Sequence, residues 1–164
     1  VFNPIEDGKS FLENALIKAR ELYRLSQRPI LADDSGLCVP ALDGEPGIYS
    51  SRYGYDEGLA SDDMGRNNLL LERMKGNQDR RAFFVCCMVL YLDENRFFIA
   101  QEHFAGQIAT EVAGAGGFGY DPLFYLPEFG KTVAELPDSI KNQLSHRAKA
   151  TMAIKKIMDE IAPI

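Results

Sequence analysis

The chain has 164 residues, of which 46% are hydrophobic and 26% are charged, a composition typical of one folded domain and not of a disordered chain. The formal net charge of −6 makes a nucleic-acid polymer a poor partner, because there is no excess of Lys and Arg to replace its counterions. The longest apolar run, residues 82–92, is too short to cross a bilayer as a helix, and no signal peptide is visible, so no membrane partner is expected.

The first predicted helix begins at Ser10. Ser10 and Glu13 form the capping-box pattern S-x-x-E, and the following apolar residues recur at helical spacing. Asn14 and Lys18 line one flank of this apolar stripe. A lysine there usually extends its ammonium group into water, so Lys18 alone indicates no function. Glu6, in the irregular segment before the helix, is interpreted as a solvated loop acid.

A short buried strand is predicted at residues 30–32, and it leads directly into Asp33, Asp34 and Ser35. We expect both carboxylates in a loop at the end of this strand, where open α/β sheets usually bind ligands. Adjacent carboxylates repel each other, so a fold that holds them needs a compensating cation. Their oxygen atoms suit Mg²⁺, with Mn²⁺ as an alternative. An ordinary turn with two solvated acids explains the same residues equally well.

The middle of the chain predicts a second helix and a group of strands. Ser61 is the expected N-cap of the helix, and Arg52 before it is either a phosphate ligand or a surface arginine. Strands are expected at residues 81–92, 97–104, 107–112 and 123–125. The three cysteines show neither zinc-ligand spacing nor a disulfide framework, which predicts a reducing, cytoplasmic environment.

Residues 114–122 combine four glycines with two aromatic residues and one acid. Bare backbone and aromatic rings suit the binding of a flat ring by stacking and hydrogen bonds. A flexible glycine-rich turn with packing aromatics is the alternative interpretation. No Walker or dinucleotide-binding pattern fits this stretch.

The last predicted helix begins after Ser145, and its first turn carries His146, Arg147 and Lys149. Cations at a helix N-terminus oppose the helix dipole by about 0.3–1 kcal/mol each. The placement of His146 and Arg147 therefore indicates a ligand, although an irregular exposed helix start would look the same. The expected core face of this helix is Ala150, Ala153, Ile154, Ile157, Met158 and Ile161.

Four motifs together resemble one family. They are A-D-D-S-G-L at 32–37, G-x-P-G-I-Y-S-x-R-Y at 44–53, G-G-F-G-Y-D-P at 116–122 and S-H-R at 145–147. In this order they resemble the inosine/xanthosine triphosphate pyrophosphatases, which remove deaminated purine nucleotides. The resemblance covers nearly the whole chain. It implies an elongated α/β fold with a mixed β-sheet flanked by helices and the nucleotide in a cleft between two lobes.

The resemblance also implies Mg²⁺-dependent hydrolysis of ITP, dITP or XTP to the monophosphate and pyrophosphate, by a homodimer. It implies that Asp34 is the general base and a metal ligand, with Glu6 and Asp33 as further metal ligands. Lys18 would act on the phosphates as a catalytic group, with Ser35 and Arg52 nearby. The residues implied for the base are Phe118, Gly119, Tyr120, Asp121, Lys141, His146 and Arg147.

One departure concerns the N-terminus. The family opens with a strand and a Ser/Thr-x-Asn-x-x-Lys loop that cradles the triphosphate, and nothing before Glu6 supplies it. We expect residues 1–164 to be a single domain that lacks this N-terminal piece. Two alternatives remain open: a non-catalytic module that binds purine nucleotides, and a phosphatase of another fold that forms an aspartyl-phosphate.

Overall fold

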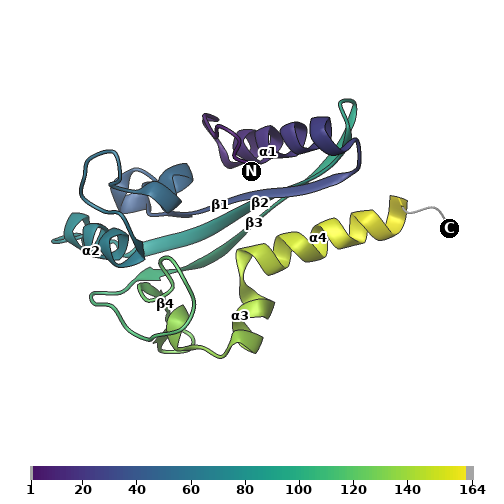
Figure 1. The fold of residues 1–164 in the computed structure, drawn as a ribbon. Coiled ribbons are helices and arrows are strands. Elements are labelled where there is room, and N and C mark those ends of the chain that lie inside the picture. The colour runs from purple at the N-terminus through teal and green to yellow at the C-terminus, as the bar shows by residue number, and fades with distance from the viewer. Residues whose placement is uncertain (1, 162–164) are drawn as a thin grey trace. The chain divides into compact units, whose positions relative to one another are not determined.

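The computed structural model describes residues 2–161, which form an open five-stranded sheet flanked by helices (Figure 1). The strand order is β1-β2-β3-β4-β5. The pairs β3–β4 and β4–β5 are antiparallel, with Gln107 opposite Tyr125 and Tyr125 opposite Thr132. The α/β fold is therefore confirmed, although the sheet neighbours with a described register are antiparallel where a mixed sheet was expected. The elements are α1 (Phe11–Ser26), β1 (Ile30–Cys38), α2 (Asp63–Arg73), β2 (Arg81–Asp93), β3 (Arg96–Ile108), β4 (Phe124–Leu126), β5 (Lys131–Thr132), α3 (Asp138–Leu144) and α4 (His146–Ile161).

Local sequence signals account for the starts of the helices. The Ser10 hydroxyl accepts a hydrogen bond from the Glu13 amide (3.1 Å), and the Ser145 hydroxyl accepts one from the Ala148 amide (3.2 Å). The expected cap of α2 is wrong by one residue, because Asp62 and not Ser61 caps it, through the Gly65 amide (2.7 Å). A carboxylate at this position also interacts favourably with the helix dipole.

The strand expected at residues 107–112 does not form as a separate element. Gln107 and Ile108 instead complete β3. Beyond them, the Ala109 amide donates to the Leu123 carbonyl (2.8 Å) and the Ala113 amide to the Pro122 carbonyl (3.0 Å). These loop hydrogen bonds satisfy the backbone without a further strand.

The chain divides into two compact units. The first comprises the chain up to Ser35, Val85–His103 and the chain from Ser145 onward. Its strands are covered by α1 on one side and α4 on the other (Figure 1). Alternate residues of β2 face these two helices: Val89 and Tyr91 pack in the α1 cluster, and Met88 and Leu90 in the α4 cluster. Successive strand residues in this unit therefore face different helices.

The helix α4 contacts the sheet mainly through its first half. Ala150 and Ile154 are buried, whereas Met158 and Ile161 are 45% and 42% exposed. The sequence pattern is thus right for the start of this core face and wrong for its end.

The second unit comprises Gly36–Phe84 and Phe104–Leu144. Its core joins α2 to the short strands and the loops around them. The Phe124 ring lies 4.6 Å from the Phe84 ring and 5.4 Å from the Phe104 ring, measured between centroids. None of the helices within residues 2–161 has the length and apolarity needed to cross a membrane.

Arg80 binds three backbone carbonyls from two segments of the second unit. Its guanidinium donates to the carbonyls of Met74 (3.1 Å), Ile108 (2.9 Å) and Ala109 (2.5 Å). Arg80→Met removes these donors from partly buried carbonyls, so we expect the free energy of unfolding to fall by about 2 kcal/mol. Urea denaturation measures this change.

The matched control is the neighbouring Arg81, which is exposed and pairs with Asp79 (2.6 Å). Arg81→Met should change the free energy of unfolding by less than about 0.5 kcal/mol, because exposed ion pairs contribute little. Equal effects of the two substitutions would show that the hydrogen bonds of Arg80 do not stabilise the fold more than an exposed ion pair does.

Candidate functional site

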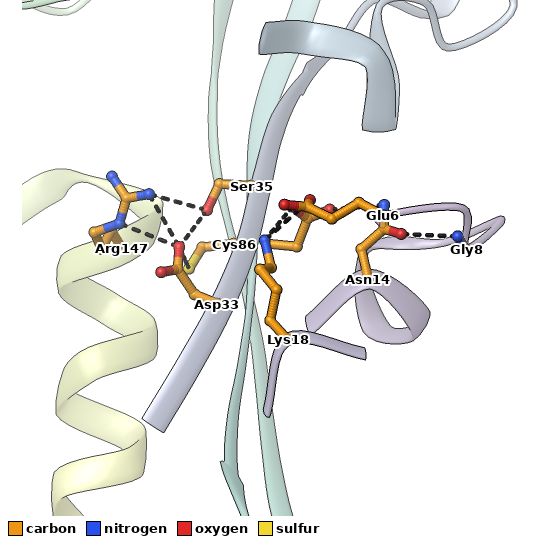
Figure 2. A network of polar contacts seen from close by, with 9 residues as sticks. Glu6, Gly8, Asn14, Lys18, Asp33, Ser35, Cys86 and Arg147 are labelled. Carbon is orange, nitrogen blue, oxygen red and sulfur yellow. Dashed lines mark hydrogen bonds and ion pairs between the residues drawn. The ribbon is translucent and has the colours of Figure 1, made fainter. Parts of the chain in front are cut away.

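The two adjacent acids lie within β1 and not in a loop after it, so the expected loop is wrong. Successive side chains of a strand point to opposite faces of a sheet. Asp34 therefore faces α1, where it contacts Lys18. Asp33 and Ser35 face α4 (Figure 2). The fold separates the two negative charges instead of placing them side by side.

On the α1 side, Lys18 joins two carboxylates. Its Nζ atom lies 2.8 Å from Asp34 Oδ1 and 3.2 Å from Glu6 Oε2. The expected extension of Lys18 into water is thus wrong, and Glu6 is not simply a solvated loop acid. Two acids and one lysine from three different segments form a polar cluster in the first unit (Figure 2).

Asn14 supports this cluster and was not among the predicted site residues. It is fully buried; its Nδ2 atom donates to Asp34 Oδ2 (3.4 Å), and its Oδ1 atom accepts from the Gly8 amide (2.9 Å). A Cβ atom on Gly8 would lie 2.6 Å from Asn14 Oδ1, so a larger residue here would force the Asn14 side chain to shift. The sequence signal for Asn14 was the position of a polar amide beside an apolar helical stripe, one turn before Lys18.

The cluster changes the proton affinities of its members. Burial raises the pKa of the Asp34 carboxyl above its ordinary value, although the hydrogen bonds from Lys18 and Asn14 lower it. Burial lowers the pKa of Lys18, but the hydrogen bond and charge of Asp34, together with Glu6, outweigh burial and raise it. Lys18 is thus held as a cation beside a carboxyl that has more than usual affinity for a proton.

On the α4 side, Asp33 pairs with Arg147. Asp33 Oδ2 lies 2.9 Å from Arg147 Nη2 and 3.3 Å from its Nε, and it also accepts from the Ser35 hydroxyl (3.0 Å). Burial raises the pKa of Asp33, but the charge and hydrogen bonds of Arg147 outweigh burial and lower it. His146 precedes Arg147 at the start of α4. Asp33 and Ser35 therefore lie on the opposite face of β1 from Lys18, and the metal and phosphate roles expected for them stay predictions.

A divalent cation on the α1 side would have few protein ligands. Within residues 2–161, no three Asp, Glu, His or Cys side chains are grouped closely enough to hold an ion. Glu6 and Asp34 remain as two carboxylates drawn to one cation, the Lys18 ammonium. Mg²⁺ is commonly bound by one or two carboxylates together with water and substrate phosphates, so this donor pair fits Mg²⁺.

The glycine-rich segment of the second unit presents an aromatic ring. The Phe118 side chain is exposed (65%), and its amide donates to Asp121 Oδ2 (3.0 Å). Asp121 is buried and forms an ion pair with Lys141, whose Nζ atom lies 4.5 Å from the centroid of the Phe118 ring. An exposed ring on a fixed backbone is a suitable surface for stacking.

Two side chains of α2, also absent from the predicted site, hold the next residue of this segment. The Gly119 amide donates to Asp63 Oδ2 (2.7 Å), and Asn67 Nδ2 donates to the Gly119 carbonyl (2.9 Å). Asp63 and Asn67 are four residues apart and so lie on one helix face. In the sequence they look like ordinary helix-start residues, and only the fold brings them to Gly119.

Two predicted site residues of the second unit have other contacts. Tyr120 is buried in the core, where burial raises its pKa, and its hydroxyl donates to the Ser50 carbonyl (2.9 Å). Its side chain is therefore packed internally, and the contact of Tyr120 with the base stays a prediction. The Arg52 guanidinium lies 5.1 Å from the centroid of the Tyr49 ring, and its phosphate contact stays a prediction.

Comparison with known proteins places the chain in a family. A family model described as "Ham1 family" matches residues 1–157. The chain belongs to the Ham1 family. A dITP/XTP pyrophosphatase of Treponema denticola is 52% identical over 158 residues, covering 96% of this chain and 81% of the relative. A dITP/XTP pyrophosphatase of Leptospira interrogans is 45% identical over 159 residues, covering 96% and 79%.

Solved Ham1 structures share this fold. A HAM1 protein from Coxiella burnetii has a TM-score of 0.91 and 40% identity, covering 98% of this chain and 82% of that one. The Staphylococcus aureus Ham1 protein has a TM-score of 0.90 and 36% identity, with the same two coverages. The family resemblance drawn from the four motifs is therefore confirmed.

The backbone conformation before Phe118 requires a glycine at position 117. Its φ is +72°, and a Cβ atom there would lie 2.1 Å from Asp121 Oδ2. Gly117→Ala combines backbone strain with displacement of a buried hydrogen-bonded carboxylate. We expect the free energy of unfolding to fall by about 3 kcal/mol, as measured by urea denaturation.

Gly130 is the matched control, because its φ is +62° and a Cβ atom on it would meet no other atom within 4 Å. Gly130→Ala should therefore show only the backbone strain, about 1 kcal/mol. If both substitutions had the same effect, the contact between Gly117 and Asp121 would have no energetic importance.

Proposed function

We propose that this chain is a Mg²⁺-dependent nucleoside triphosphate pyrophosphatase. Its substrates would be the deaminated purine nucleotides ITP, dITP and XTP, and its products the monophosphate and pyrophosphate. The observation that carries the proposal is the position of Lys18 Nζ between the carboxylates of Glu6 and Asp34. The names of the Ham1 relatives from Treponema denticola and Leptospira interrogans support the substrate class.

The α1 side of β1 has the groups needed for hydrolysis of a phosphoanhydride. Asp34 accepts the proton of the attacking water, and the Asn14 amide keeps its carboxyl oriented. Lys18 stabilises negative charge on the phosphate oxygens. Because the products are a monophosphate and pyrophosphate, the attack falls on the α-phosphorus. A Mg²⁺ ion held by Glu6 and Asp34 would neutralise phosphate charge and lower the pKa of a bound water.

The proposed specificity depends on hydrogen-bond donors. Hypoxanthine and xanthine have a 6-oxo acceptor where adenine has an amino donor. Donors from His146 and Arg147 would pair with the 6-oxo oxygen of hypoxanthine or xanthine. With adenine bound, these donors would lack an acceptor. In the second unit, the exposed Phe118 ring is the proposed stacking surface for a purine, with Lys141 and Asp121 fixing its segment.

The experiment is an assay of pyrophosphate release from ITP, XTP, dITP, GTP and ATP by the full-length protein, with Mg²⁺ and with a chelator. We expect rapid release from ITP, dITP and XTP, little from ATP, and none without the metal. Tight binding of ITP without hydrolysis would favour a non-catalytic binding module. Release of orthophosphate would favour the aspartyl-phosphate phosphatase.

We also propose that the protein acts as a homodimer in the cytoplasm. The family resemblance supports the dimer. The three cysteines, Cys38, Cys86 and Cys87, are free thiols, which supports a reducing compartment. Light scattering of the purified full-length protein measures its oligomeric state directly.

A further inference from the structure

The Asp33 carboxylate collects an unusual number of donors on one oxygen. Arg147 donates to Asp33 Oδ2 through Nη2 (2.9 Å) and Nε (3.3 Å), and the Ser35 hydroxyl donates to it as well (3.0 Å). The Cys86 thiol lies 3.7 Å from the same oxygen. Figure 2 shows this group on the side of β1 away from Lys18 and Glu6. Side chains of three elements therefore hold Asp33 in one orientation: Ser35 of β1, Cys86 of β2 and Arg147 of α4.

The helix α4 does not by itself favour a guanidinium at Arg147. This residue lies in the first turn, where a cation opposes the helix dipole, and its side chain remains 46% exposed. A free arginine side chain at such a position would sample many rotamers. The two hydrogen bonds to Asp33 fix the Nε–Nη2 edge of the guanidinium, and hence its plane.

This arrangement leaves one donor group of Arg147 for a ligand. Among the hydrogen bonds of the described residues, Arg147 uses Nε and Nη2, and Nη1 takes part in none. A guanidinium held by one edge presents its remaining N–H groups in a fixed direction. Such pre-organisation lowers the entropy lost when a ligand acceptor is bound.

We propose that Asp33 is a positioning residue that orients Arg147 for recognition of the purine 6-oxo group. The proposal rests on the proposed function and refines it. The two neighbouring acids would have different roles. Asp34 takes part in hydrolysis on the α1 side of β1, and Asp33 contributes to substrate selection on the α4 side. This role differs from the metal-ligand role that the resemblance implies for Asp33.

The first test compares kcat and KM for ITP and ATP in the full-length protein and its Asp33→Ala variant. We expect the ratio of kcat/KM for ITP over ATP to fall about tenfold, mainly through a higher KM for ITP, with kcat within about threefold. Asp33→Asn keeps one acceptor oxygen and should show a smaller change in the same direction. In the Arg147→Ala background, Asp33→Ala should change the ratio by less than about twofold, because Asp33 acts through Arg147.

Asp93 provides the matched control. It forms a similar acid–arginine pair with Arg96 in the same unit, at the turn between β2 and β3, with 2.7 Å between Asp93 Oδ2 and Arg96 Nε. Asp93→Ala should leave the ratio unchanged. A large loss of kcat in Asp33→Ala with an unchanged ratio would overturn the proposal, and so would independent, multiplying effects of Asp33→Ala and Arg147→Ala.

A second measurement separates this proposal from the proposed function. In the free ¹⁵N-labelled protein, the Arg147 Nε–H resonance, assigned with Arg147→Lys, should exchange slowly with water and should lose this protection in Asp33→Ala. An unprotected resonance, or one unaffected by Asp33→Ala, would overturn the positioning role whatever the enzyme activity. Absence of pyrophosphate release by the wild-type protein would instead remove the proposed function, while the resonance still decides whether Asp33 holds Arg147.

Discussion

Asp34→Asn is expected to lower kcat for ITP by about 10³-fold, because the amide cannot accept the proton of the attacking water. Lys18 should keep its ion pair with Glu6, and Asn14 keeps a hydrogen-bonding partner of the same shape, so the variant should fold. The affinity for ITP should change far less than kcat. Steady-state release of pyrophosphate gives kcat, and calorimetry with a non-hydrolysable ITP analogue gives the affinity.

The exposed Asp79 is a suitable control for this substitution, because it belongs to the second unit and pairs only with its neighbour Arg81 among the described residues. Asp79→Asn should leave kcat unchanged. A kcat for Asp34→Asn within a few-fold of the wild-type value would exclude Asp34 as the general base.

Arg147→Ala is expected to lower the preference for ITP over ATP by about 10²-fold. A site that hydrogen-bonds a substrate group can discriminate by roughly 10⁴ against an analogue that lacks it, and His146 would retain part of this selection. The kcat for ITP should change less than the ratio, because Arg147 lies on the other face of β1 from Asp34. Competition between ITP and ATP in one reaction measures the ratio directly.

Lys149 gives the control for loss of a positive charge from the same helix turn. Its Nζ atom donates to the His103 carbonyl (3.0 Å) on β3. Lys149→Ala should leave the ITP/ATP ratio near the wild-type value. If it lowered the ratio as much as Arg147→Ala, the selection would come from the overall charge at the start of α4 and not from a directed hydrogen bond.

The sequence was sufficient to predict the features that depend on nearby residues. Ser10 and Ser145 cap their helices as expected, and the long apolar run forms the buried strand β2. The order of four motifs was enough to indicate the family. These features were predictable because helix caps, periodic burial and motif spacing are encoded within a few residues of the chain.

The tertiary structure decided how the two acids are used. Asp, Ser and Gly are typical of turns and rare in strands, so their sequence predicted a loop after residues 30–32. In the fold, partners 16 and 114 residues away in the chain, Lys18 and Arg147, neutralise Asp34 and Asp33 on opposite faces of β1. Compensation of this kind lets two acids remain in a partly buried strand, because each charge has its own cation.

Contacts between distant segments also explain why the sequence did not indicate some residues of the site. Asn67 reaches the Gly119 carbonyl across 52 residues of chain, and the Tyr120 hydroxyl reaches Ser50 across 70. The sequence by itself therefore determined the family and the starts of α1 and α4, and it supplied most of the candidate residues. Only the tertiary structure decided which face each acid serves and which partner holds it, because hydrogen bonds and ion pairs depend on distances between segments that chain order does not specify.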